Sequence, residues 1–241
     1  MKVLSVDSSS VTASVALVED EKIIAEFFMD AGLTHSQTLA PMIDSILSYS
    51  GTKPSDVDLY AVTTGPGSFT GLRIGVSTIK AMALANNKPC AQISSLEALA
   101  YNSLGKNTLV CASLDARRDQ IYSALFRIKN NEVYRVTPDE AKLVENLVSD
   151  LEKFDENIEF VGDGAEICYN RIMQNDKTCK YSLAPKCSRY VAAHNVAYLA
   201  QKQHKLGASS DACRIKLNYL RVPQAERLLK EKLYQGQEVS K

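Results

Sequence analysis

Short apolar runs alternate with polar turns along the first hundred residues of the chain. The runs that predict strands are residues 1–7, 13–18, 22–29, 58–63 and 89–93. Residues 36–50, 72–85 and 95–104 instead predict helices, because their apolar side chains recur at helical spacing. Gly51 follows the first of these helices and is expected to end it.

The same order begins again after residue 105. Strands are predicted over residues 108–114, 120–127, 132–136 and 158–161, and helices over residues 137–150, after Gly164, and over residues 188–205. Thr137, Pro138 and Glu140 have the spacing of a helix start, with a capping Thr and Pro at the first helical position. The repeated β-β-β-α-β-α order predicts an α/β fold of two lobes with mixed sheets, over residues 1–105 and 106–241. The late helix is expected to return to the first lobe.

Composition narrows the classes of function. The 241 residues carry 28 Lys and Arg and 28 Asp and Glu, so no net basic field exists for non-specific nucleic-acid binding. The six cysteines form no C-x-x-C pair, and buried thiols are expected. Asp7 interrupts the first apolar run, and no uninterrupted apolar stretch is long enough to span a membrane. We therefore expect a cytoplasmic protein without a membrane partner.

A glycine-rich junction joins the strand at residues 58–63 to the helix at residues 72–85. It contains Gly65, Gly67, Gly71 and Gly75 together with Pro66. Glycines at a strand-to-helix turn let the backbone come close to another group. That group is a phosphate, an RNA or a protein helix, and these alternatives separate an enzyme from a subunit.

Five segments carry a family resemblance. They are LSVDSSSVTASVAL (residues 4–17), THSQTLAPMIDSIL (34–47), VTTGPGSFTGLRIGVSTIKAMA (62–83), LDARRDQIYSALF (114–126) and YLRVPQAER (219–227). The chain resembles the TsaB (YeaZ) family. This resemblance implies an actin-like ATPase (ASKHA, ribonuclease H-like) fold and a non-catalytic subunit for making threonylcarbamoyladenosine in tRNA, at the adenosine next to the anticodon.

The resemblance also implies the partners. TsaD, the catalytic paralogue, holds the metal and transfers the threonylcarbamoyl group, and the ATPase TsaE joins the pair. No cofactor is expected in this chain, while ATP and a metal ion are expected in the partner subunits. The chain is expected to contact tRNA within the complex and to form a homodimer when alone.

The resemblance places the partner contact on the helices at residues 36–50 and 72–85, in a four-helix bundle. Because the second helix is apolar nearly all round, one face is expected on its own sheet and another on the partner. The alternative is that both are ordinary core helices. The predicted partner-binding residues are Leu39, Met42, Ile43, Ile46, Leu72, Arg73, Gly75, Val76, Ile79 and Met82. Arg73 is expected either to contact a carboxylate or phosphate of a partner or to face solvent.

Metal and protease chemistry find little support in the sequence. In TsaD a His-x-x-x-His pair binds the metal, and the matching positions here are Ser95 and Leu99. His35, His194 and His204 include no pair four residues apart. His35 is expected to face solvent, cap the helix or contact a partner. Ser68 directly follows Gly67, which is the wrong spacing for a G-x-S-x-G nucleophile.

Nucleotide binding is harder to dismiss. Asp7 and Asp115 are weak candidates because they stand where the phosphate and magnesium loops of this fold carry acidic residues. Gly162 and Gly164 are weak candidates because residues 161–165 resemble an adenosine-binding turn. Neither aspartate is followed by a glycine, however, and turn formation explains all four. An autonomous actin-fold small-molecule kinase or ATPase therefore remains the alternative function. Arg117 and Arg118 are expected on opposite faces of extended chain, either in a salt bridge or solvated, with a phosphate or tRNA contact as the alternative.

Overall fold

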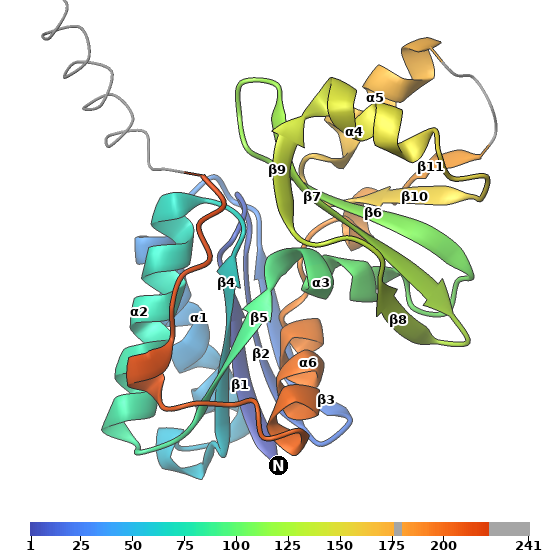
Figure 1. Ribbon diagram of the computed structural model, residues 1–241. Coiled ribbons are helices and arrows are strands. Elements are labelled where there is room, and N and C mark those ends of the chain that lie inside the picture. The colour runs from blue at the N-terminus through green and yellow to red at the C-terminus, as the bar shows by residue number, and fades with distance from the viewer. Residues whose placement is uncertain (176–179, 222–241) are drawn as a thin grey trace, which may run out of the picture.

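The computed structural model describes residues 1–175 and 180–221. These residues form two α/β lobes, each built on one mixed sheet (Figure 1). The strand order is β3-β2-β1-β4-β5 in the first sheet and β11-β10-β6-β7-β8 in the second, where β9 also pairs with β7. The predicted fold of two α/β lobes with mixed sheets is confirmed.

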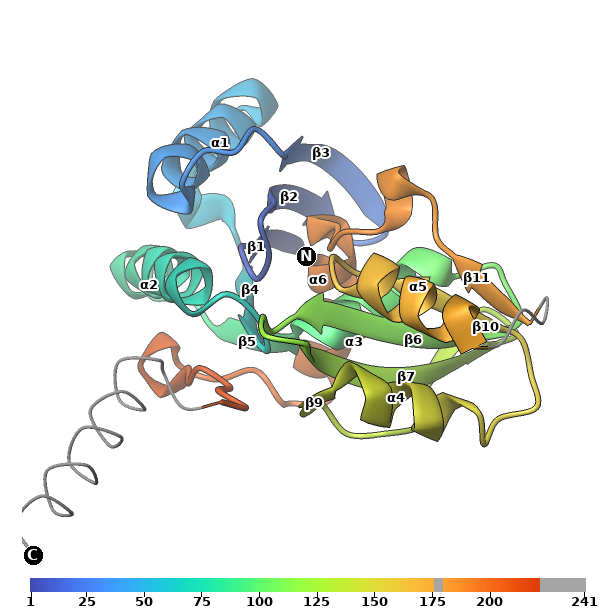
Figure 2. The same ribbon diagram turned by 90° about the horizontal axis from the view of Figure 1, so that it is seen from above.

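The first sheet is antiparallel along β3-β2-β1 and parallel along β1-β4-β5. Its strands are β1 (Lys2–Asp7), β2 (Ala13–Glu19), β3 (Lys22–Met29), β4 (Leu59–Gly65) and β5 (Cys90–Ser94). Helices α1 (His35–Ser50) and α2 (Phe69–Ala85) cover one face, and α6 (Ala193–Lys205) covers the other (Figures 1 and 2). Side chains alternate accordingly, since Leu4 and Val6 pack under α1 and α2 while Val3 belongs to the core cluster under α6.

The second sheet comprises β6 (Thr108–Asp115), β7 (Gln120–Lys129), β8 (Glu132–Arg135), β9 (Glu140–Leu143), β10 (Ile158–Val161) and β11 (Tyr181–Leu183). Helices α4 (Val144–Leu151) and α5 (Ala165–Asn175) lie on one face, and α3 (Ser95–Ala100) packs on β6 and β7 from the side of the first lobe (Figure 1). Four short 3-10 turns complete the described elements: Pro54–Asp56, Tyr101–Ser103, Lys186–Ser188 and Ala212–Arg214.

The helix predicted over residues 137–150 is wrong in its first half. Residues Glu140–Leu143 form β9, which pairs with β7, and the helix begins only at Val144. The Thr137 hydroxyl accepts a hydrogen bond from the backbone N–H of Leu125 at 2.9 Å instead of capping a helix. Pairing with a neighbouring strand therefore overrides a local helix-start pattern.

Other helix ends differ by a few residues. The α2 helix starts at Phe69 rather than Leu72, because the Ser68 side chain accepts a hydrogen bond from the N–H of Gly71 and caps it. The helix predicted over residues 95–104 ends at Ala100 and continues as a 3-10 turn, and α6 starts at Ala193 rather than at residue 188. Gly51 ends α1 in the left-handed conformation, as predicted.

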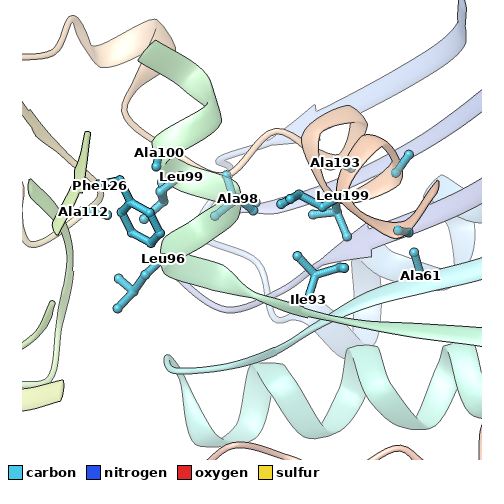
Figure 3. Close-up of a cluster of buried hydrophobic side chains, with 14 of the residues drawn as sticks. Ala61, Ile93, Leu96, Ala98, Leu99, Ala100, Ala112, Phe126, Ala193 and Leu199 are labelled. Carbon is cyan, nitrogen blue, oxygen red and sulfur yellow. The ribbon is translucent and has the colours of Figure 1, made fainter. Parts of the chain in front are cut away.

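The largest buried cluster joins the two lobes. It contains Val3 and Ile93 from the first sheet, Val110 and Phe126 from the second, and side chains of α3 and α6. Figure 3 shows Leu96 and Leu99 of α3 beside Phe126, with Ile93, Ala193 and Leu199 toward the first lobe. The lobes therefore share a core rather than meeting at a wet interface.

Candidate functional site

The glycine junction packs directly on the turn that follows β1. A Cβ atom at Gly67 would lie 2.2 Å from the carbonyl oxygen of Ser9, and one at Gly71 would lie 2.2 Å from that of Ser8. At Gly75 a Cβ would lie 2.3 Å from the Ser8 hydroxyl oxygen. Such distances exclude any side chain without movement of the backbone. The glycines thus bring the start of α2 into van der Waals contact with this turn.

Hydrogen bonds also join the start of α2 to the turn after β1. The N–H of Ser68 donates to the carbonyl of Ser9 at 2.7 Å, and the Ser8 hydroxyl donates to the carbonyl of Gly71 at 2.9 Å. His35 Nε2 lies 2.9 Å from the carbonyl oxygen of Ser10. His35 is the first residue of α1, so this bond ties α1 to the turn, which is a structural role in addition to those predicted for it.

Asp7 lies beneath this turn and is fully buried. One carboxylate oxygen accepts hydrogen bonds from the Thr63 hydroxyl at 2.6 Å and the Ser9 N–H at 3.3 Å. The other has no hydrogen-bond partner among the described residues, and burial raises the pKa of Asp7. Ser8, Ser9 and Ser10, which follow Asp7, are also buried, so this turn is covered by its own chain.

The matching turns of the second lobe are arranged differently. Asp115 is exposed at the end of β6, and its N–H donates to the Asp163 carboxylate at 2.9 Å. A Cβ at Gly162 would lie 1.9 Å from the Ser113 carbonyl oxygen, and one at Gly164 would lie 3.0 Å from the Asp115 nitrogen. These glycines therefore let the turn after β10 pack on the end of β6, which is an alternative to a ligand-binding role.

Carboxylates gather where the two lobes meet. Burial, with smaller contributions from Asp115 and Asp7, raises the pKa of Asp163 to about 6. Within the described residues, no group of three or more His, Cys, Asp or Glu side chains is placed to hold a metal ion. Ser95 and Leu99, predicted from the sequence to match the TsaD histidine pair, are both fully buried in α3.

The remaining histidines contact their own chain. His194, at the start of α6, lies 2.7 Å from the Glu26 carboxylate on β3, through its Nδ1 atom. His204 Nδ1 lies 2.7 Å from the Ser209 hydroxyl. The first interaction joins α6 to β3, and the second joins the end of α6 to the segment that follows it.

Eight of the ten predicted partner-binding residues lie in the first lobe's own core. The buried eight are Leu39, Met42, Ile43, Ile46, Leu72, Gly75, Val76 and Ile79, while Met82 is half-buried and Arg73 is exposed. These eight residues are covered by their own chain, and their direct contact with a partner stays a prediction. The outward faces of the two helices carry mostly small or polar residues: Ala40, Pro41, Asp44 and Ser48 on α1, and Thr70, Ser77, Ala81, Leu84 and Ala85 on α2.

Sequence reasoning missed the segment at residues 208–221, which we call the C-terminal strap. Its backbone pairs with Cys90 at Ser210, and the N–H of Asn218 donates to the carbonyl of Thr64 at 2.8 Å. The Arg221 guanidinium donates to the carbonyl of Ala116 in the second lobe. The motif YLRVPQAER was its one signal, and residues 222–227 of that motif lie outside the described residues.

Arg73 is held by this strap. Its Nε donates to the Tyr219 hydroxyl at 2.9 Å, and its guanidinium carbon lies 3.8 Å from the centroid of the Phe69 ring. The Phe69 and Tyr219 rings stack with centroids 4.5 Å apart. Arg117 and Arg118, predicted in extended chain, instead have φ of 61° and 58° in the turn between β6 and β7. The backbone at these two residues is left-handed, so the prediction of extended chain is wrong.

The comparisons with known proteins identify close similarities. The sequence model of the family "TsaD: tRNA N6-adenosine threonylcarbamoyltransferase" matches residues 29–236. The "tRNA threonylcarbamoyladenosine biosynthesis protein TsaB" of Bacillus subtilis is 28% identical over 226 residues, covering 94% of this chain and 96% of that protein. The protein with the same description from Escherichia coli is 35% identical over 150 residues, covering 61% and 64%.

Solved structures agree with the sequence matches. YeaZ from Pseudomonas aeruginosa superposes with a TM-score of 0.79 at 25% identity, over 91% of this chain and 99% of that one. The activator of 2-hydroxyisocaproyl-CoA dehydratase from Clostridium difficile has a TM-score of 0.51 at 10% identity and covers 86% and 97%. The second similarity shows the fold alone, which is that of the actin-like ATPases. None of the described helices is long and apolar enough to cross a membrane.

Proposed function

Because this chain belongs to the TsaD family and, within it, to the TsaB (YeaZ) group, we propose that it is a non-catalytic subunit that activates a TsaD-type transferase. Membership of this group gives it a role in tRNA threonylcarbamoyladenosine biosynthesis. In the proposal, TsaD transfers the threonylcarbamoyl group to the adenosine next to the anticodon, and TsaE joins the pair. ATP and the metal ion are bound by these partners, and the chain itself needs no cofactor.

The packing of α2 on the turn after β1 is the observation that supports a non-catalytic role best. Gly67 and Gly71 fill the space next to Ser8 and Ser9, above the buried carboxylate of Asp7. An enzyme that transfers phosphate needs backbone N–H groups free to approach it at such a turn. Here the N–H of Ser9 donates to the Asp7 carboxylate, and the carbonyl of Ser9 and the hydroxyl of Ser8 are bonded to the start of α2.

The outward faces of α1 and α2 are the proposed docking surface for TsaD. The two helices lie side by side on one face of the first sheet (Figure 2). Small exposed residues such as Ala40, Ser77 and Ala81 allow the backbones of two helix pairs to approach closely, and Leu84 adds an apolar contact with 54% of its side chain exposed. The same surface serves self-pairing when TsaD is absent.

The experiment that tests the proposal compares ATP turnover and tRNA modification in four mixtures, each supplied with unmodified tRNA and a threonylcarbamoyl donor. The mixtures are the isolated chain, the chain with TsaD, the chain with TsaD and TsaE, and TsaD with TsaE but without the chain. We expect turnover near background for the isolated chain, co-elution with TsaD, and tRNA modification that depends on adding the chain. Substantial ATP turnover by the isolated chain would instead support an autonomous actin-fold kinase or ATPase. Failure to co-elute with TsaD would also contradict the proposal.

A further inference from the structure

We infer that Arg73, Arg117 and Arg118 form a contact for the sugar–phosphate backbone of RNA on this chain. We call the surface around these three arginines the seam ridge, because it crosses from the first lobe to the second. The inference rests on the function proposed above, which supplies tRNA as the substrate. It goes further by assigning part of the RNA contact to this chain and to named side chains.

Four of the nine described arginines form ion pairs, and five do not: the three arginines of the seam ridge, Arg214 and Arg221. The ion pairs are Arg127 with Glu156, Arg135 with both Glu97 and Asp139, Arg171 with Glu145, and Arg189 with Glu166. The three arginines of the seam ridge are exposed, and none pairs with a carboxylate of the described chain. Asp115 and Asp119 stand on the same turn as Arg117 and Arg118 without such a pair, so the guanidinium groups remain open to an external anion.

Arg73 is already oriented for binding. Its Nε is bonded to the Tyr219 hydroxyl and its guanidinium lies on the Phe69 ring, so the side chain has lost much of its freedom before any ligand arrives. Its two terminal nitrogens have no hydrogen-bond partner within the described residues. An arginine held in this way presents a fork that matches two phosphate oxygens and loses less conformational entropy on binding.

Arg117 and Arg118 are held by their backbone. Together with Asp119 they form three consecutive non-glycine residues with positive φ, of 61°, 58° and 55°. Each such residue costs about 1 kcal/mol relative to ordinary backbone, and strained turns of this kind are concentrated at functional sites. The turn is closed by a 3.0 Å bond from the N–H of Ala116 to the carbonyl of Gln120, and it carries both side chains outward.

The C-terminal strap makes one continuous surface from these two parts. Tyr219 contacts Arg73, and two residues later Arg221 donates to the carbonyl of Ala116, which directly precedes Arg117. Figure 1 shows the strap running alongside α2. The ridge therefore combines basic groups from both lobes with the stacked rings of Phe69 and Tyr219.

RNA fits this surface better than an acidic protein does. Aromatic rings next to guanidinium groups are typical of surfaces on which unpaired bases stack while the arginines bind phosphates. Tyr219 keeps 38% of its surface exposed. Since the formal net charge of the chain is zero, RNA binding here requires such a local group of arginines.

The test is the salt dependence of binding to a fluorescent, unmodified tRNA transcript, measured by anisotropy for the isolated chain and for its complex with TsaD. The variant Arg117→Ala with Arg118→Ala removes two proposed phosphate contacts. We expect roughly tenfold weaker binding at low salt and a plot of log K against log salt that is shallower by roughly 1.5 to 2. Arg73→Ala is expected to make it shallower by about 1.

Arg214→Ala is the matched control, because Arg214 is exposed on the same strap but stands before Tyr219 and away from the seam. The Arg214→Ala variant is expected to change neither the affinity for the tRNA transcript nor the slope of log K against log salt. An unchanged slope in the double variant would overturn the inference. So would a double variant that loses TsaD while binding RNA normally, since the arginines would then meet an acidic protein surface. Failure of the unaltered chain to bind TsaD contradicts the proposed function alone, because the isolated chain still reports on RNA.

Discussion

The packing of α2 on the turn after β1 depends on the absence of a side chain at Gly71. Replacing it with alanine places a Cβ 2.2 Å from the backbone oxygen of Ser8 and 2.9 Å from the His35 ring. The backbone must shift at a point where α1, α2 and the turn after β1 meet. We expect Gly71→Ala to lower the free energy of unfolding by about 2–3 kcal/mol, measured by urea denaturation.

Ser77→Ala is the control for this change, since Ser77 lies on the exposed face of the same helix. It is expected to change stability by less than about 0.5 kcal/mol. Equal stabilities for the two variants would mean that the turn moves easily, and would remove the argument that it is rigidly filled.

Asp163 makes stability depend on pH. Its pKa in the folded chain is about 6 against an ordinary value of 3.8, so between these values the folded state holds more protons than the unfolded state. Its contribution to stability is therefore greatest below pH 4 and is lost as pH rises through about 6. We expect Asp163→Asn to be more stable than the unaltered chain at pH 8, by about 2 kcal/mol, with a difference that fades toward pH 4.

Urea denaturation at several pH values measures this difference. Asp119→Asn serves as the control, because Asp119 is exposed on the neighbouring turn and no increase near pH 8 is expected. A stability difference for Asp163→Asn that stays constant from pH 4 to 8 would contradict the raised pKa.

At the scale of elements, the sequence predicts α1 well because residues within and next to the helix determine where it ends and which face is buried. Gly51 supplies the left-handed residue that ends it, and its apolar stripe matches the buried face. The helix start predicted at Thr137 was wrong, because the pairing of β9 with β7 is a contact between distant segments. Local patterns do not contain such pairings, so elements determined by them are missed.

The candidate site was likewise predicted in part from the sequence, where local residues determine it, and missed where contacts between distant residues determine it. The importance of the glycine junction was visible in sequence, because four glycines at a strand-to-helix turn demand a close neighbour. Which apolar residues of α2 face inward was not visible, since apolar side chains occur around most of the helix. The strap was also missed, because its contacts with Thr64, Arg73 and Ala116 join residues far apart in the chain.

The exposed face of α2 leads to a prediction about assembly. Leu84→Asp places a charge on the proposed docking surface without disturbing the core, whereas changes at Ile43 or Ile79 would unfold the first lobe. We expect Leu84→Asp to weaken binding to TsaD at least about tenfold, equivalent to about 1.4 kcal/mol, in a titration followed by calorimetry.

Leu206→Asp is the matched control for Leu84→Asp. Leu206 is 79% exposed just after α6, on the opposite face of the first sheet, and binding should be unchanged. If both variants bind TsaD as the unaltered chain does, the docking surface lies elsewhere.

For the whole molecule, the shared core means that the lobes are not independent. Val3 and Ile93 of the first sheet are in one cluster with Val110 and Phe126 of the second. We expect the slowest-exchanging amides of β1 and β6 to report the same free energy of opening, within about 1 kcal/mol, in native-state hydrogen exchange. Two distinct values would show that one lobe unfolds while the other stays folded.

The position of α6 also has a consequence for synthesis of the chain. The last strand of the first sheet ends at Ser94, but α6, which covers one face of that sheet, begins only at Ala193. The carbonyl of Ala193 accepts a hydrogen bond from the Ser5 hydroxyl of β1. At about 5–20 residues per second, the ribosome needs roughly 5–20 s to make the residues between these points. During that interval the nascent first lobe shows an apolar surface that its own chain cannot yet cover. Chaperones that recognise such surfaces therefore have a defined period in which to act on this chain.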